Sequence, residues 1–376
     1  MRLSLSDVHA HGWLAERLDR AAVGVENLFA SLWWVGAHGW GYEHPARWLR
    51  NMVLHAEYTG TAHPGIDEIG EGLLEVWRSG RAAVDYERHA IAVYNHEELL
   101  MGLMYYAQFR PNDAVVQAAR ELARYIVDHH ARNTHYYKSL AIGRLLDFDR
   151  RFGDAAVRAG AREIADGEGT VLLDLSAHGA AAGMIGVWHV ELIEATGDAR
   201  YLGWARDIQQ AMCARMMVTG GIGEMLHFVE APGESDLHDE TCQTVWWLLL
   251  NLALWRATGE TPYLDLAERI VLNHLLFQQL HRGEDSGFTA MNDIDQGCRG
   301  NHNYICCDNE GYYGLLETLR HVFTRDDATQ TLSVNLFLPA EARVGETRVR
   351  LRTDYPARGA VCLRVDGAAA AFRLRV

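Results

Sequence analysis

The sequence has no run of lysine and arginine interleaved with aromatic residues, and its formal net charge is −15. Nucleic-acid binding needs clustered basic side chains, so this composition argues against a nucleic-acid partner. The longest apolar run, residues 245–254, is interrupted by Asn251 and is shorter than the roughly 18 residues of a membrane span. The first 20 residues lack the apolar core of a signal peptide. We therefore expect a soluble, cytoplasmic protein without a membrane partner, and the sequence leaves a homo-oligomer open.

Cysteines are too few for a disulfide scaffold in a chain of 376 residues. In a reducing compartment, clustered cysteines are better explained by a metal or by catalysis. The six cysteines are Cys213, Cys242, Cys298, Cys306, Cys307 and Cys362.

Helical periodicity dominates the first 280 residues. The predicted helices cover residues 47–58, 95–109, 113–129, 136–152, 181–196, 201–217, 244–258 and 261–279. Three helices end at a Thr-Gly pair, with Gly60, Gly197 and Gly259 as the expected C-terminal stops. Such recurring helix–turn–helix units indicate a helical array, and periodicity alone does not show whether the array closes into a ring.

The composition changes near residue 328. From Thr331 onward, short segments alternate apolar and polar residues between Gly and Pro turns, which is typical of strands. We therefore predict a helical domain over residues 1–328 and a partial β-sandwich over residues 329–376. The second segment is too short for a complete sandwich and should have unpaired edges unless it docks elsewhere.

Two segments concentrate the residue types that carry chemistry. Residues 219–247 contain Glu240 and Cys242 just before an apolar helix, and residues 303–307 end in Cys306 and Cys307 before a second helical stretch at 312–323. One carboxylate and three thiols suit a tetrahedral zinc site. The residues alone also allow plainer explanations: Cys242 as a small buried side chain, and the Cys-Cys pair as two core cysteines or a vicinal disulfide.

These motifs resemble those of glycoside hydrolase family 127, the β-L-arabinofuranosidase-like proteins. The resemblance rests on Thr-Gly-Gly-Ile-Gly at 219–223, Glu-Thr-Cys at 240–242 and Cys-Cys at 306–307, with softer matches at 39–49, 267–274, 334–339 and 353–356. It implies an all-α fold of the (α/α)6 toroid type with a short C-terminal β-sandwich fragment. The implied activity is zinc-dependent hydrolysis of a carbohydrate with retention.

The resemblance also implies roles for single residues. Glu240, Cys242, Cys306 and Cys307 would bind Zn²⁺, and Cys306 would be the nucleophile. The acid/base would be Glu230, since Phe228 and Val229 would desolvate it and raise its pKa, with Glu224 in reserve. The expected sugar-binding residues are His96, His178 and His227.

Two other classes of function remain open. One is a degenerate, non-catalytic glycosidase in which zinc only holds two segments together, since four protein ligands are typical of a structural site. The other is a zinc-thiolate lyase or cyclase on a helical toroid. The Cys-His-Gly sequence typical of lanthionine-cyclase-like enzymes is absent here.

Overall fold

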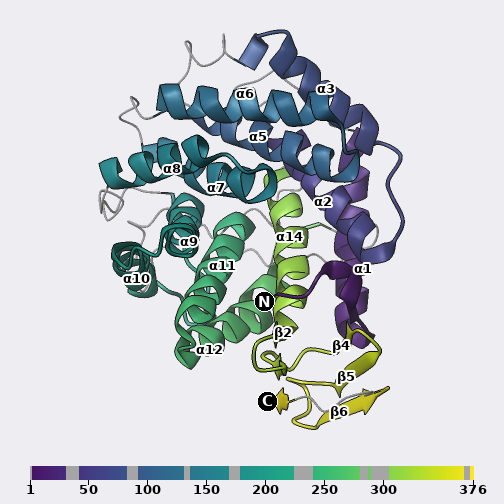
Figure 1. Cartoon of the computed structure of the whole chain (residues 1–376). Coiled ribbons are helices and arrows are strands. Elements are labelled where there is room, and N and C mark those ends of the chain that lie inside the picture. The colour runs from purple at the N-terminus through teal and green to yellow at the C-terminus, as the bar shows by residue number, and fades with distance from the viewer. Residues whose placement is uncertain are drawn as a thin grey trace, which may run out of the picture.

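The computed structural model describes residues 2–30, 42–82, 92–130, 136–168, 178–223, 240–279, 287–288, 305–367 and 373–376. Helices form most of this part of the chain, and short strands follow at its C-terminal end (Figure 1). None of the described helices is long and apolar enough to cross a membrane.

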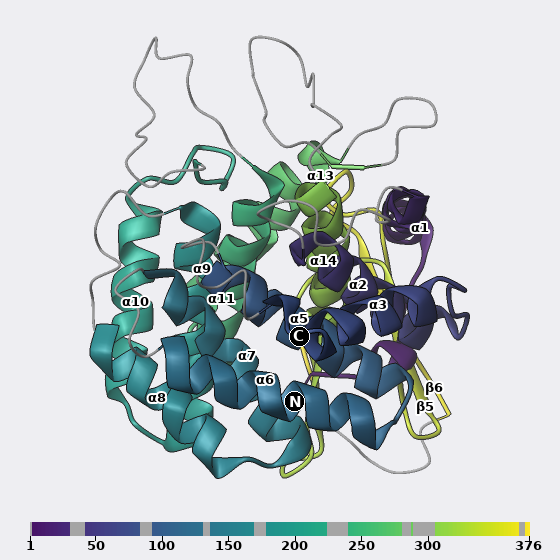
Figure 2. The same ribbon diagram turned by 90° about the horizontal axis from the view of Figure 1, so that it is seen from above.

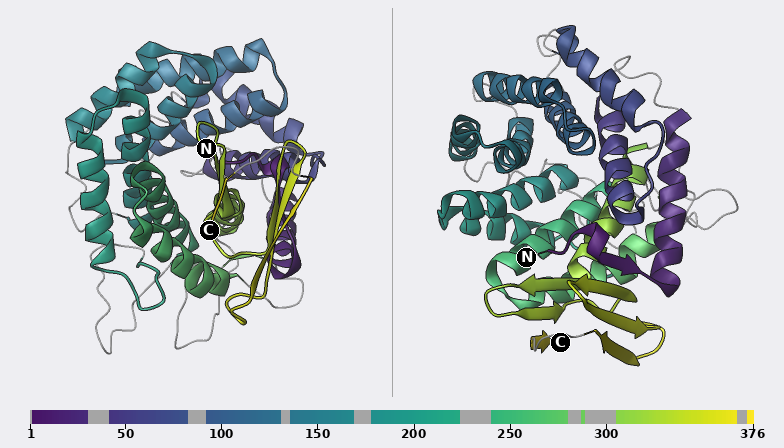
Figure 3. Two further views of the ribbon diagram at one scale, coloured as in Figure 1. Left: turned by 60° about the horizontal axis from the view of Figure 1, so that its bottom comes forward. Right: turned by 45° about the vertical axis from the view of Figure 1, so that its right-hand side comes forward.

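Six helices form a closed inner ring. They are α2 (Glu43–Thr59), α5 (Ala92–Phe109), α7 (Ala141–Phe152), α9 (Gly179–Thr196), α11 (Thr241–Thr258) and α14 (Ile305–Val322). Each packs against the next, and α14 packs against α2 and closes the ring. The predicted toroid is therefore confirmed, and in Figure 3 (left) the helices follow one another around the ring.

A second layer of helices covers the ring from outside, seen from above in Figure 2. It comprises α1 (Gly12–Asn27), α3 (Ile66–Arg78), α6 (Asp113–His130), α8 (Ala155–Glu168), α10 (Arg200–Cys213) and α12 (Thr261–Ile270). Outer helices alternate with inner helices along the chain. The sequence explains the two layers, because α11 is apolar over most of its surface and is buried from Thr241 to Trp255, whereas α3 buries only one face.

The helix ends follow the predicted punctuation. Gly60, Gly197 and Gly259 each adopt a left-handed conformation immediately after α2, α9 and α11, a conformation that glycine adopts without steric cost. The predicted helix over residues 261–279 consists of α12, one π-helical turn (Val271–Leu275) and the short α13 (Leu276–Gln278). The close contact between α9 and α11 also requires a glycine, since a Cβ on Gly183 would lie 2.9 Å from the backbone of Trp246.

The strands form two small sheets. β1 (Val8–Ala10), β4 (Ala340–Val344), β5 (Thr347–Thr353) and β6 (Val361–Asp366) form one antiparallel sheet. The other contains β2 (Phe323–Asp326), β3 (Thr331–Val334) and β7 (Arg373–Arg375). The N-terminal strand β1 thus pairs one edge of the C-terminal segment. The domain boundary at residue 328 stays a prediction, and β2 begins five residues before it.

Candidate thiolate metal centre

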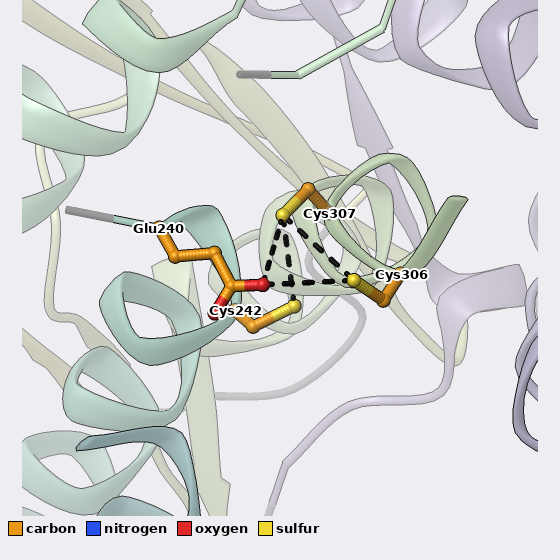
Figure 4. A group of neighbouring side chains, drawn as sticks. All are labelled: Glu240, Cys242, Cys306 and Cys307. Atoms are coloured by element: carbon orange, nitrogen blue, oxygen red, sulfur yellow. Dashed lines mark hydrogen bonds between the residues drawn. The ribbon is translucent and has the colours of Figure 1, made fainter. Parts of the chain in front are cut away.

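Four side chains from two distant segments meet at one point of the inner ring (Figure 4). Glu240 immediately precedes α11 in an extended conformation, and Cys242 lies in the first turn of α11. Cys306 and Cys307 lie in the first turn of α14. Because α11 packs directly against α14, both pairs stand at neighbouring helix N-termini. The partial positive charge of a helix N-terminus favours thiolates and carboxylates.

The spacing of the four donor atoms fits a tetrahedral zinc ion. Zinc bonds of about 2.3 Å to sulfur and about 2.1 Å to oxygen place two sulfurs roughly 3.8 Å apart and a sulfur and an oxygen roughly 3.6 Å apart. The sulfur of Cys307 lies 3.9 Å from that of Cys242 and 4.0 Å from that of Cys306. Oε1 of Glu240 lies 3.6 Å from the Cys306 sulfur and 3.4 Å from the Cys307 sulfur.

The three thiols differ in exposure and in acidity. Cys242 and Cys307 are buried, whereas Cys306 is partly exposed. Hydrogen bonds from the Cys242 and Cys307 thiols hold the pKa of Cys306 well below its usual range, although burial opposes this. The pKa values of the other two thiols are raised, that of Cys242 chiefly by its bond to Cys306 and that of Cys307 chiefly by burial. The partly exposed cysteine is therefore also the one whose pKa is lowered.

A buried arginine of α2 contacts α14 one helical turn beyond the cysteines. The guanidinium of Arg47 on α2 forms ion pairs with Glu43 at 3.0 Å, with Glu98 on α5 at 3.2 Å and with Glu310 on α14 at 3.2 Å. It also donates a hydrogen bond to Tyr94. Glu310 follows Cys306 by four residues on the same helix, so Arg47 ties the first turns of α14 to two other inner helices.

The charges of this network shift several pKa values. Burial raises the pKa of Glu43 to about 8, although Arg47 opposes the shift. Burial also acts to raise the pKa of Glu98, but Arg47 and Arg144 outweigh it and bring the value below the usual range. Arg47 further lowers the pKa of Cys306. The arginine therefore contributes positive charge to a site rich in anionic groups.

Polar contacts also fix the helix turn that follows the cysteine pair. Asp308 accepts a hydrogen bond from the backbone N–H of Phe288 at 2.5 Å. The Asn51 amide donates to both the backbone and the side-chain oxygen of Asn309, at 2.7 and 3.0 Å. Together with the contacts of Glu310, these bonds hold α14 to α2 and to the backbone at Phe288.

The family follows from the sequence match. Residues 70–315 match the profile of the β-L-arabinofuranosidase GH127 catalytic domain. The chain belongs to this family. It is therefore a glycoside hydrolase, and a carbohydrate is its substrate. No curated protein matches the sequence at a significant level.

Solved structures show the same fold at low sequence identity. A GH127 β-arabinofuranosidase is 14% identical with a TM-score of 0.76, and the aligned region spans 97% of this chain and 69% of that structure's chain. A GH127 β-L-arabinofuranosidase from Geobacillus stearothermophilus T6 is 13% identical with a TM-score of 0.73, over 98% of this chain and 74% of that one. An unsaturated glucuronyl hydrolase from Streptococcus agalactiae is 14% identical with a TM-score of 0.57, over 83% and 92%.

The other predicted site residues of this GH127 chain lie in different places. Nε2 of His178, just before α9, is 3.4 Å from Oε2 of Glu240, so His178 joins the cluster. His96 is buried on α5, where its Nε2 lies 2.8 Å from the backbone oxygen of Ala82. Glu224, His227 and Glu230 lie outside the described residues, and so does Cys298.

Sequence reasoning missed the arginine network. Its clearest signal is the i, i+4 spacing of Glu43 and Arg47, within a stretch that already resembles the family at 39–49. Charged residues spaced in this way usually form an exposed pair on a helix surface. Only the ring closure shows that this pair is buried beside the cluster.

Proposed function

We propose that this GH127 chain is a zinc-dependent retaining glycosidase, with Cys306 as nucleophile and Glu230 as acid/base. L-Arabinofuranose in β linkage is the sugar that the family resemblance favours. The main support is the cluster itself: three thiols and one carboxylate at tetrahedral spacing, in which Cys306 is the one cysteine that is not fully buried.

Each residue of the cluster has a defined task in this scheme. Glu240, Cys242, Cys306 and Cys307 would hold the zinc ion. When bound, zinc would keep the thiols ionised at neutral pH, where a free thiol is mostly protonated. His178, close to Glu240, would orient that carboxylate or contact the sugar.

The reaction then proceeds in two displacements. The Cys306 thiolate attacks the anomeric carbon and forms a carbon–sulfur bond while the bond to the leaving oxygen breaks. The carboxylic acid of Glu230 gives its proton to that oxygen. The resulting Glu230 carboxylate next removes a proton from water, whose oxygen attacks the same carbon and displaces the Cys306 sulfur. Two inversions at one carbon retain its configuration.

The nucleophile is tested by trapping it. Wild-type enzyme incubated with an arabinofuranoside carrying a good leaving group should gain the mass of one anhydropentose on the peptide that contains Cys306. Cys306→Ser should lose turnover and this adduct while keeping the fold, whereas Cys213→Ser and Cys362→Ser, at exposed thiols outside the cluster, should keep both. Full activity of Cys306→Ser would eliminate the nucleophile assignment.

The metal and the acid/base need separate tests. Elemental analysis should find about one zinc per chain in wild type and little in Cys242→Ala, and chelation should abolish activity and lower the melting temperature. An active, metal-free preparation would contradict the mechanism, and a zinc-loaded protein inactive on all glycosides would favour the non-catalytic alternative. Glu230→Gln should slow substrates with poor leaving groups most, and an effect from Glu224→Gln alone would move the role to Glu224.

A further inference from the structure

One face of the sheet β1–β4–β5–β6 carries most of its charged side chains. Residues opposite one another in the ladder share a face, so His9, Glu341, Arg350 and Arg364 form one row across four strands. Arg343, Arg348 and Asp366 form the next row, and Arg352 stands opposite Cys362. We call this the arginine face. The other face carries Ala340, Ala342, Val349 and Leu351, which are buried.

The positive charge of the arginine face exceeds its negative charge. Five arginines stand against two carboxylates, in a chain whose net charge is −15. Glu341 is contacted by three of the arginines: Arg350 at 2.7 Å, Arg348 at 3.0 Å and Arg343 at 3.8 Å. One carboxylate cannot neutralise three guanidinium groups. Arg352 forms no ion pair with any residue that the structure describes.

The arginine face is hollowed rather than flat. A depression of about 510 Å³ is lined by Arg343, Arg350 and Arg352 together with His9, His11, Ala10 and Glu341. Nε2 of His11 is buried and has no hydrogen-bond partner within the described parts of the chain. The depression thus combines surplus guanidinium groups with a ring nitrogen that still needs a partner.

These features define the chemistry of a ligand. Guanidinium groups bind carboxylates through paired hydrogen bonds. Among the residues that the structure describes, the two imidazoles are the only aromatic rings that line the depression, so these residues provide no large stacking platform of the kind on which nucleic-acid bases usually rest. Every second residue of β5 is an arginine, at Arg348, Arg350 and Arg352, so these residues are spaced about 6.8 Å apart along the strand. This regular spacing suits a ligand with repeated negative groups.

We propose that the arginine face binds an acidic, carboxylate-bearing polysaccharide at a site separate from the thiolate cluster. The cysteines lie in the first turn of α14, whereas the strands follow the other end of that helix (Figure 1). A helix of 18 residues is about 27 Å long. The arginine face would therefore anchor one part of a polymer while another part of the same polymer reaches the catalytic centre. The proposal rests on membership of a glycoside hydrolase family and does not depend on zinc or Cys306.

Affinity electrophoresis with polygalacturonate tests this site, and fully methyl-esterified polygalacturonate is the matched polymer without charge. Wild type should be retarded by the charged polymer only, and added salt should weaken the retardation. Arg343→Gln/Arg352→Gln should weaken binding about tenfold or more, since each side chain contributes a charge-assisted contact. Both side chains are exposed, so the melting temperature should not change.

The control variant is Arg78→Gln/Arg158→Gln, which removes the same charge from exposed positions outside the sheet. It should bind like wild type, and all three proteins should hydrolyse a small chromogenic glycoside equally. Equal loss of binding in both double variants, or no retardation of wild type, would overturn the site. Equally strong retardation by single-stranded DNA would overturn the assignment to a polysaccharide.

Discussion

Replacing Arg47 with methionine tests whether the buried network stabilises the ring. The side chain of Arg47 is 4% exposed, and those of Glu98 and Glu310 are fully buried. Methionine is unbranched and apolar and fills only part of the space that the arginine side chain occupies. The substitution would remove the charge together with the contacts of the guanidinium group, so the effect should be mainly electrostatic with a smaller loss of packing.

The expected loss can be worked out from the partners that remain. Removing one member of a buried ion pair typically costs about 3–5 kcal/mol. Glu310 would keep Arg50 at 3.1 Å, and Glu98 would keep Arg144 at 3.8 Å. Burial raises the pKa of Glu43 to about 8 even with Arg47 beside it, so this carboxyl can take up a proton when the guanidinium group is removed and is not left as a buried charge. We therefore expect Arg47→Met to lower the free energy of unfolding by an amount near the lower end of this range, about 3 kcal/mol. This loss corresponds to a melting temperature lower by about 4 °C.

Urea denaturation and thermal melting would measure this loss. The control is Arg110→Met, because Arg110 forms an equally short ion pair with Asp67 at 2.9 Å but both side chains are about half exposed. Exposed pairs contribute about 0–1 kcal/mol. Adding Glu98→Gln to Arg47→Met should recover part of the loss, since it removes a buried carboxylate that keeps only the longer contact with Arg144. If Arg47→Met costs no more than Arg110→Met, or stabilises the protein, the network is not a net source of stability.

Three further predictions concern other parts of the ring. Burial lowers the pKa of His189 to about 4, whereas in the unfolded chain this histidine binds a proton below about pH 6.5. The free energy of unfolding should therefore fall by about 1.4 kcal/mol for each pH unit between about pH 6.5 and pH 4. Urea titrations at several pH values should show a smaller slope for His189→Phe. Burial opposes ionisation of Glu317, but neighbouring arginines bring its pKa to about 2. The contribution of the Glu317 carboxylate to the free energy of unfolding should therefore be lost as the pH falls from about 4.5 to 2. Glu317→Gln should make stability less dependent on pH over this range. A Cβ on Gly143 would lie 2.1 Å from the Trp188 ring, so Gly143→Ala should cost about 1–3 kcal/mol in the same assay, whereas Gly72→Ala, with open space around it, should be neutral or stabilising.

The sequence predicted the helices well where periodicity is strong, and less well at the cluster of Glu240 and the three cysteines. It places a helix at 312–323, but α14 begins at Ile305. The segment Cys-Cys-Asp-Asn-Glu-Gly has low helix propensity, which explains the late predicted start. Contacts with residues far along the chain stabilise these turns, including Asn51 to Asn309 and Arg50 to Glu310. Local sequence cannot show such contacts.

The sequence predicted which residues form the cluster better than it predicted the geometry of the cluster. The spacing of Glu240 and Cys242 predicts two side chains on one side of an extended segment. In the structure only Glu240 is extended, and Cys242 already belongs to α11. The two residues still converge, because a helix start turns its first side chains toward the residue before it. The family motif named the four residues that the structure brings together, but it did not reveal that both pairs occupy helix N-termini.

Charge balance shows why the site needs more than the motif residues. Three thiolates and one carboxylate carry four negative charges, and a divalent zinc ion would offset two of them. Groups outside the motif offset part of the rest, and the helix N-termini of α11 and α14 are one such source of positive charge. Arg47 is another, because it lowers the pKa of Cys306 while pairing with Glu310 on the same helix. It lies on α2, about 260 residues before the cysteines. Ring closure, which brings α2 against α14, therefore places the charge of Arg47 beside the cysteines.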